Sequence, residues 1–155
     1  MFKKMRRNDR ALTQEGAIDL LIKGEYGVLS TIGENGYAYG VPLSYAYNEG
    51  KIYFHAATEG LKLDNITLNN KVCFTVIGDT KVIPEKFSTN YESTMVFGKA
   101  AIVEGEEKIE GLRLIIEKYS PEFMESGMEY INRAQMATKV VKIEIDEITG
   151  KMSKR

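Results

Sequence analysis

The sequence predicts a mainly β protein, an antiparallel β-barrel with flanking helices. Strand-like runs with alternating faces follow one another at short intervals, and turns rich in Gly and Asn separate them. Helical segments are few and do not alternate with the strands, which argues against a doubly wound parallel sheet. The 155 residues contain no repeat and no linker. We therefore expect a single domain spanning residues 1–155.

The N-terminal part divides into an arm and a helix. Residues 1–12 are locally basic, as in Lys3 and Lys4, and we expect an arm that is either solvated or docked on another subunit. A helix is expected over residues 13–24, because Thr13 can cap its start and Gly24 can end it.

The next part of the chain predicts a hairpin with an unusual second strand. Asn35-Gly36 favours a tight turn between a strand at 26–32 and a strand at 37–47. Side chains alternate along a strand, so the second strand has one bulky face and one nearly bare face. The bulky face carries Tyr37, Tyr39, Val41, Leu43, Tyr45 and Tyr47, and the bare face carries Ala38, Gly40, Pro42, Ser44 and Ala46. A bare face admits either a packed helix or subunit, or a flat ligand. Pro42 marks an edge or a bulge.

The remaining elements follow from the same signals. Barrel strands are expected within 26–104, a helical segment at 105–137 and a last strand at 138–146, whose outer face is polar. Within the helical segment a first helix is expected from Gly105 to Tyr119, because Pro121 breaks it. Within the barrel region the predicted elements are strands at 51–55, 71–77 and 91–104, a helix at 61–68 and a polar loop that contains Pro84.

Composition excludes several function classes. Lys and Arg number 21 against 22 Asp and Glu, so nothing in the net charge favours nucleic acid or an anionic membrane as the partner. The single cysteine, Cys73, rules out a disulfide within one chain, and with only one histidine a zinc site of the usual type is not expected. No apolar run approaches the roughly 18 residues of a membrane span, and no signal peptide is recognised. We expect a cytoplasmic protein with no bound metal.

Common catalytic motifs are also missing. The sequence has no Gly-x-Ser-x-Gly elbow, no P-loop and no dinucleotide fingerprint. It has no paired-Asp motif for a metal-dependent hydrolase. Redox or other demanding chemistry would therefore come from a cofactor.

Residues 53–62 are the most informative segment. A strand ends there, small and hydroxylic residues follow, and a helix begins with Lys62 in its first turn. The open N–H groups of a helix start, close backbone approach at Gly60, the Thr58 hydroxyl and the Lys62 charge suit a phosphomonoester. A Thr-capped helix with a solvated lysine would have the same sequence. His55 is either a hydrogen-bonded structural residue or a group beside a redox cofactor that holds an anionic substrate or transfers a proton.

Several short motifs together resemble a known family. They occur in order nearly end to end and comprise residues 5–10, 26–31, 41–45, 52–57, 60–62, 71–74, 91–93, 97–100 and 148–151. In these motifs the chain resembles the pyridoxamine 5′-phosphate oxidase-like flavoproteins, and within them the 5-nitroimidazole reductase (Nim) group.

The resemblance implies an FMN-binding split β-barrel homodimer, with FMN held at the subunit interface. It makes Lys62 the phosphate ligand, helped by Gly60 and Thr58, and places His55 against the flavin and its small-molecule partner as the catalytic residue. It assigns further flavin contacts to Tyr53, Phe54, His55, Ala56, Ser30, Thr31, Pro42, Leu43, Val76, Tyr91 and Ser93, the last two from the same or the partner subunit.

The function expected from this resemblance is FMN-dependent oxidation or reduction of a small molecule such as a nitroaromatic. Electrons would come from NAD(P)H or another donor. Pyridoxamine 5′-phosphate oxidation is an alternative, although no second phosphate site and no arginine-rich C-terminal end are visible. A second alternative is a flavin- or haem-binding stress protein with little turnover, and a third is a dimeric barrel without a cofactor.

Overall fold

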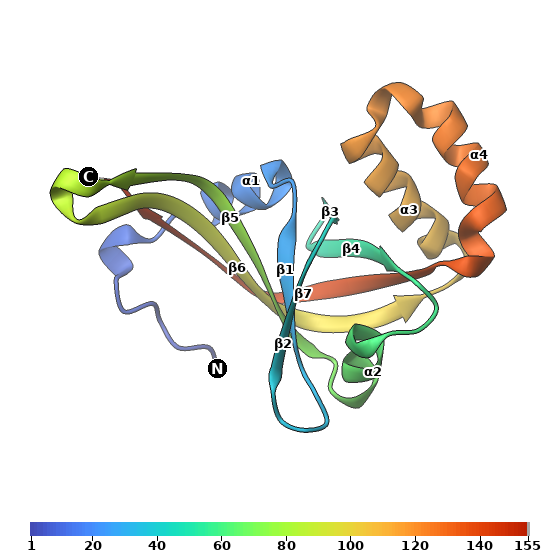
Figure 1. Cartoon of the computed structure of the whole chain (residues 1–155), viewed down its shortest axis with the longest axis horizontal. Helices are drawn as coiled ribbons and strands as arrows, with labels where there is room; N and C mark the ends of the chain where they lie inside the picture. Colours follow the sequence, from blue (N-terminus) through green and yellow to red (C-terminus); the bar gives the residue numbers. More distant parts are fainter. Residues whose placement is uncertain (155) are drawn as a thin grey trace.

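One antiparallel sheet of seven strands organises the molecule, in the order β2-β1-β5-β6-β7-β4-β3. The structure is a computed structural model, and it describes residues 1–154. The strands are β1 (Gly27–Ile32), β2 (Ala38–Leu43), β3 (Ala46–Asn48), β4 (Lys51–Ala56), β5 (Lys71–Ile83), β6 (Ser88–Val103) and β7 (Lys139–Ser153). The helices are α1 (Gln14–Lys23), α2 (Leu61–Leu68), α3 (Gly105–Tyr119) and α4 (Met124–Ala134), and short 3₁₀ turns lie at Asn8–Arg10, Pro84–Lys86, Pro121–Phe123 and Gln135–Ala137. Figure 1 shows this arrangement. The expectation of a mainly β fold with flanking helices is confirmed.

The sheet curls because the chain passes directly from one of its edges to the other. β2 and β3 are the two edge strands, and only Ser44 and Tyr45 separate them in sequence. The predicted single strand at 37–47 is therefore wrong: the chain bends at this point, with β2 paired to β1 and β3 paired to β4. Tyr45 turns its ring into the core at the bend, where it is fully buried against Phe74. Pro42 lies on an edge strand, as the sequence predicts.

The barrel core is built from the inward faces of these strands. Its largest fully buried side chains include Leu29, Tyr45, Ile52, Phe54, Phe74, Val76, Val96, Val141 and Ile143. α1 covers one end of the barrel, and it begins where expected, since the Thr13 hydroxyl accepts a hydrogen bond from the N–H of Gly16 at 3.0 Å.

Three strands are longer than the sequence pattern predicts. β5 continues past Ile77 to Ile83, and β6 begins at Ser88, so that most of the expected polar loop is a two-stranded ribbon that extends from the barrel (Figure 1). Charged residues on this ribbon gave it the composition of a loop. β7 continues past Asp146 to Ser153. Its pairing with β6 shifts register between Phe97 and Gly98, so the alternation of side chains is interrupted there although the pairing of the two strands continues.

The α3–α4 hairpin covers the outer face of β4. α3 has the bounds predicted, and it lies close to the sheet at Gly111, where an added Cβ would be 3.0 Å from the Tyr53 ring. The Tyr53 hydroxyl donates to Glu107 at 2.9 Å, and Lys142 of β7 pairs with the same carboxylate at 3.1 Å. Burial is the main reason why the pKa of Tyr53 rises to about 12. These contacts hold Tyr53 under the helix.

Lys118, in the last turn of α3, is a buried amine. Among the described residues its Nζ has no hydrogen-bond partner, and it lies 3.7 Å from the centre of the Tyr45 ring. Burial lowers the pKa of Lys118 from 10.5 to about 8, so that the folded state disfavours the charged form. Below about pH 8 the free-energy cost of burying the charged Lys118 amine is fully present, and this cost disappears as the pH rises towards 10.5.

We expect Lys118→Met to stabilise the protein at pH 7. The gain should be about 1–2 kcal/mol in the free energy of unfolding, after allowance for solvent screening and for the lost cation–π contact. It should shrink between pH 8 and 10.5, measured by urea denaturation. Lys86→Met, at an exposed turn, is the control and should show no such pH dependence. An equal gain in stability at pH 7 and pH 10.5 would contradict the conclusion that burial of the charged Lys118 amine destabilises the folded state.

Candidate functional site

The bare strand face identified in the sequence is open to solvent as far as Ser44, and Ala46, beyond the bend, is buried. Ala38, Gly40, Pro42 and Ser44 are exposed, and we call these four residues the bare strip. Ser30 of β1 pairs with Gly40 and lies on the same face. No helix of the described chain covers this strip, so the packed-helix interpretation of the pattern is wrong.

Two hollows border the bare strip at Ala38. The first has a volume of about 500 Å³ and lies between the β1–β2 hairpin and α2. The second, of about 680 Å³, extends across β1 and β5, where Ser30 and Thr31 line it together with the first residues of the N-terminal arm. The two hollows adjoin at Ala38, and neither is lined by Gly60 or Lys62.

The start of α2 is an open helix end. The Gly60 carbonyl accepts hydrogen bonds from Leu63 and Asp64, and no side chain caps the helix. Thr58 is exposed and does not act as the cap, which removes the Thr-capped alternative. Gly60 has φ 145°, a conformation that favours glycine. With Lys62 in the first turn, this end offers free N–H groups and a positive charge.

A buried hydrogen bond ties α2 to the sheet. The side-chain N–H of Asn65 donates to the Thr31 hydroxyl at 3.0 Å, and both side chains are buried. The predicted flavin contact at Thr31 therefore has its hydroxyl oxygen engaged by α2. Sequence reasoning missed Asn65. Its position between the apolar residues Leu63 and Ile66, on a short helix, was the available signal.

The four residues predicted along β4 divide between two faces. Phe54 and Ala56 point into the barrel, and Tyr53 and His55 point outwards toward α3 and α4. Phe54 is fully buried, and Tyr53 is engaged under α3. The side chains of Phe54 and Tyr53 are thus turned away from solvent in the single chain, and the flavin contacts predicted along this strand remain predictions. His55 is exposed and free to contact a ligand.

The other predicted flavin contacts lie in different parts of the molecule. Val76 is fully buried in the core, so its side chain cannot line a surface site; this prediction is corrected. Leu43 packs against the core from the edge strand, and Pro42 remains exposed. Tyr91 and Ser93 lie on β6 opposite Thr80 and Ile77, at the base of the ribbon, and the ribbon extends away from α2 (Figure 1). Within one chain these two residues do not meet Lys62.

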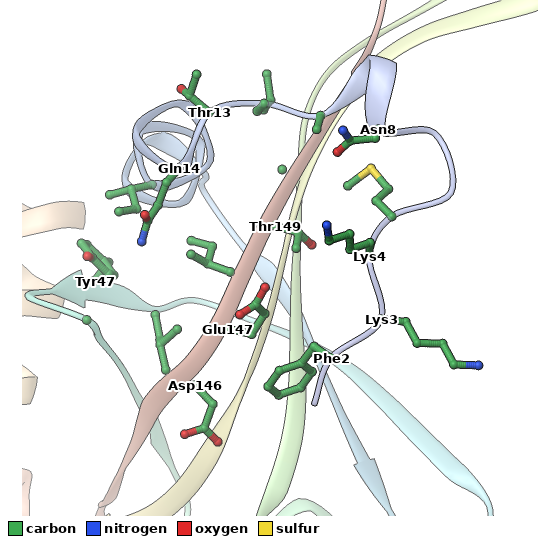
Figure 2. Close-up of a pocket in the computed structure, with 18 residues that line it drawn as sticks. Phe2, Lys3, Lys4, Asn8, Thr13, Gln14, Tyr47, Asp146, Glu147 and Thr149 are labelled. Atoms are coloured by element: carbon green, nitrogen blue, oxygen red, sulfur yellow. The ribbon is translucent and has the colours of Figure 1, made fainter.

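A further hollow lies beneath the N-terminal arm. Its volume is about 610 Å³, and the arm, the start of α1 and β7 line it. Figure 2 shows Lys4 directed toward Thr149 while Lys3 extends away. The arm is anchored by Phe2, which stacks on Phe97 with ring centres 5.3 Å apart. None of the predicted site residues lines this hollow.

Metal and thiol chemistry find little support at the site. The described residues include no cluster of three His, Cys, Asp or Glu side chains that could hold a metal ion. Cys73 faces the second hollow and is half-buried, and burial raises the pKa of its thiol, which makes it a poor nucleophile.

A comparison with protein families identifies the relatives of this chain. The profile described as pyridoxamine 5′-phosphate oxidase matches residues 13–152. The chain belongs to the pyridoxamine 5′-phosphate oxidase family. The match covers every helix and nearly every strand described above, and it confirms the family resemblance of the sequence motifs.

Solved structures with the fold of this family come from several bacteria. A candidate 5-nitroimidazole antibiotic resistance protein from Bacteroides thetaiotaomicron is 26% identical, with a TM-score of 0.79 over 92% of this chain and 86% of that one. A FAD-binding protein from Mesorhizobium loti is 19% identical, with a TM-score of 0.66 over 94% and 98%. A FAD- and haem-binding protein from Mycobacterium smegmatis is 16% identical, with a TM-score of 0.76 over 92% and 72%. The last two show the shared fold alone.

Two further findings concern curated relatives and membrane-spanning helices. The search of curated proteins found no match to this chain. Among the described residues, no helix combines the length and apolar character needed to cross a bilayer.

Proposed function

We propose that this chain is an FMN-dependent oxidoreductase that acts on a small molecule such as a nitroaromatic. The observation that carries the proposal is the presence in one chain of an open, cationic start of α2 and of an exposed strip of small residues, with two adjoining hollows beside them. The start of α2 offers a positive charge and N–H donors, and the strip offers a flat surface made of small residues. FMN has the matching form, a phosphomonoester joined to a flat and largely apolar ring.

The residues at both ends fit the cofactor. Lys62 and the first N–H groups of α2 would hold the phosphate, with close approach allowed by Gly60 and a hydroxyl offered by Thr58. At the other end, the strip residues Gly40 and Pro42 are small and exposed, and Ser30 lies beside them. The N-terminal arm lines the same hollow and would form its far side. A bound flavin supplies hydride and single-electron transfer, which the side chains of this sequence cannot supply themselves.

His55 is the residue best placed to serve the small molecule. Its imidazole is exposed on the outer face of β4, immediately before the turn that leads to Gly60. It is the sole histidine of the sequence, and an imidazole ring has one nitrogen that donates and one that accepts a hydrogen bond when it is neutral. Anchoring an anionic group or donating a proton is its proposed role.

We place FMN at the interface of a homodimer. The sheet face beside the bare strip exposes Ile32, Ile77 and Met95, which a second copy of the chain could cover. Tyr91 and Ser93 are separated from α2 within one chain, and a partner subunit could bring their equivalents to the flavin.

Anaerobic reduction tests the enzyme assignment. The FMN-saturated protein should bleach when NADH or NADPH is added, and nitrobenzene should restore the colour faster than it does for free FMN at the same concentration. Bleaching without faster reoxidation would assign the chain as a flavin binder. A haem absorption band in the purified protein, or turnover of pyridoxine 5′-phosphate, would favour the alternatives.

A further inference from the structure

Two lysines line the second hollow, on the other side of β1 from the bare strip. Lys71 of β5 and Lys99 of β6 are directly opposite each other in the pairing of these strands. Both side chains are exposed. Like charges at directly opposed positions of an antiparallel pair are destabilising. The chain therefore keeps two amines together beside the hollow although their repulsion does not favour the sheet.

One carboxylate partly balances this pair. Asp146 of β7 lines the same hollow, and the Nζ of Lys99 lies 3.2 Å from its carboxylate. Among the described residues, Lys71 has no carboxylate within ion-pair distance. Two ammonium groups against one carboxylate leave a net positive charge, whereas the whole chain carries a formal net charge of -1. The positive charge is thus local to this side of the hollow, where it attracts anions.

Small side chains lie between the lysines and the bare strip. Ser30 of β1 is paired with Cys73 of β5, and both line the hollow. Lys71 is two residues from Cys73 on the same strand, so its Cα is about 8 Å from that of Ser30 by the ordinary spacings of a sheet. A ribosyl group is long enough to join a flat ring at Ser30 to a phosphate at Lys71.

An aromatic pair lines the same hollow beyond β5. Phe97 of β6 is directly opposite Cys73, and Phe2 of the N-terminal arm stacks on it with ring centres 5.3 Å apart. Phe2 is 48% exposed, so part of its ring is available for stacking with another aromatic ring. The hollow therefore offers an aromatic surface, a cationic pair and a floor of small residues in succession.

We propose that this part of the hollow binds a pyridine dinucleotide, the electron donor, and that Lys71 and Lys99 hold its pyrophosphate. The nicotinamide lies toward Ser30 and the adenine lies toward Phe2. This inference rests on the proposed function, because it places the donor in the hollow that borders the strip proposed for the flavin ring. Lys62, the residue proposed for the phosphate of FMN, does not line this hollow.

Binding of NAD⁺ tests the site without turnover, because the oxidised dinucleotide cannot reduce the flavin. Isothermal titration calorimetry of FMN-saturated protein should show one NAD⁺ site per chain. Its affinity should fall when NaCl is raised from about 50 to about 300 mM, since salt screens exposed charges. The double variant Lys71→Gln/Lys99→Gln should bind NAD⁺ about tenfold more weakly, because it removes two charge-assisted contacts that solvent partly screens.

A matched control and a kinetic readout accompany this measurement. Lys86 is exposed at the turn between β5 and β6, outside the hollow, and Lys86→Gln should bind NAD⁺ as wild type does. The double variant should raise the KM for NADH about tenfold and leave kcat within about twofold, because the lysines contact phosphates and not the reacting atoms. If circular dichroism shows that the double variant is unfolded, Lys71→Gln replaces it and should weaken NAD⁺ binding about threefold.

The outcomes separate this inference from the proposed function. In protein that has bound FMN, the absence of NAD⁺ binding, or equal NAD⁺ affinity in wild type and the double variant, would overturn the inference and leave the flavin site intact. If the double variant lost affinity for FMN but not for riboflavin, the two lysines would hold the phosphate of FMN, which would also overturn it. In protein that does not retain FMN, salt-dependent NAD⁺ binding that the double variant abolishes would support the dinucleotide site, whereas the proposed oxidoreductase function would fail.

Discussion

Lys62→Ala should weaken FMN binding by about 10- to 150-fold. The substitution removes a charge-assisted hydrogen bond to the phosphate, and such a contact contributes about 1.5–3 kcal/mol. Lys62 is half-buried in the first turn of α2, where the helix dipole adds to its charge. Because the phosphate ester remains dianionic above its second pKa near 6, the loss should be largest at neutral pH and smaller at pH 5. Flavin fluorescence during titration measures the change.

A lysine outside both hollows provides the control. Lys86, at the turn between β5 and β6, is exposed, and Lys86→Ala should leave the affinity for FMN within about twofold of wild type, as expected for an exposed charge without a direct contact. Riboflavin, which lacks the phosphate, should bind wild type and Lys62→Ala equally. A larger loss in Lys86→Ala than in Lys62→Ala would place the phosphate elsewhere.

Gly40→Leu should prevent the flavin ring from lying on the bare strip and lower FMN affinity at least tenfold. A Cβ at Gly40 would come 3.4 Å from a Val28 methyl, which is an ordinary van der Waals contact. The barrel should therefore tolerate the new side chain, which would project onto the exposed face where the ring is proposed to bind. The same fluorescence titration, with riboflavin as well as FMN, should show the loss for both compounds.

This result distinguishes the ring from the phosphate. Gly40→Ala should have a much smaller effect, because one methyl group fits beside Val28. Ala101→Leu, at an exposed position of β6 outside the strip, should bind FMN as wild type does. Thermal unfolding of each variant checks the fold. Normal riboflavin binding by folded Gly40→Leu would contradict the proposal that the flavin ring lies on β2.

Elements with strong local signals were predictable from the sequence. α2 and α3 have the predicted bounds because Gly60 precedes α2, Gly105 begins α3 and a polar or helix-breaking residue follows each helix. The bare strip was also predictable, since it depends only on alternation along one strand. The elements that the sequence predicts correctly are the ones that a short stretch of chain determines.

Errors arose where position depends on distant parts of the chain. The bend at Tyr45 occurs because the two edges of one sheet must meet, and no local signal marks it. Phe54 and Val76 were assigned to the flavin by family resemblance, yet alternation places both in the barrel core. A small cavity that His55 lines together with α3 and α4 was not predicted, because it requires these two helices to fold back over β4.

The most direct test of the account is a titration of flavin-free protein with FMN. The sequence has no tryptophan, so changes in flavin absorbance and fluorescence report on the bound ring without that background. We predict saturation at one FMN per chain, with affinity that falls in both Lys62→Ala and Gly40→Leu. Folded protein that does not saturate, or that binds FMN equally well in both variants, would contradict the proposal that FMN lies between the start of α2 and the bare strip.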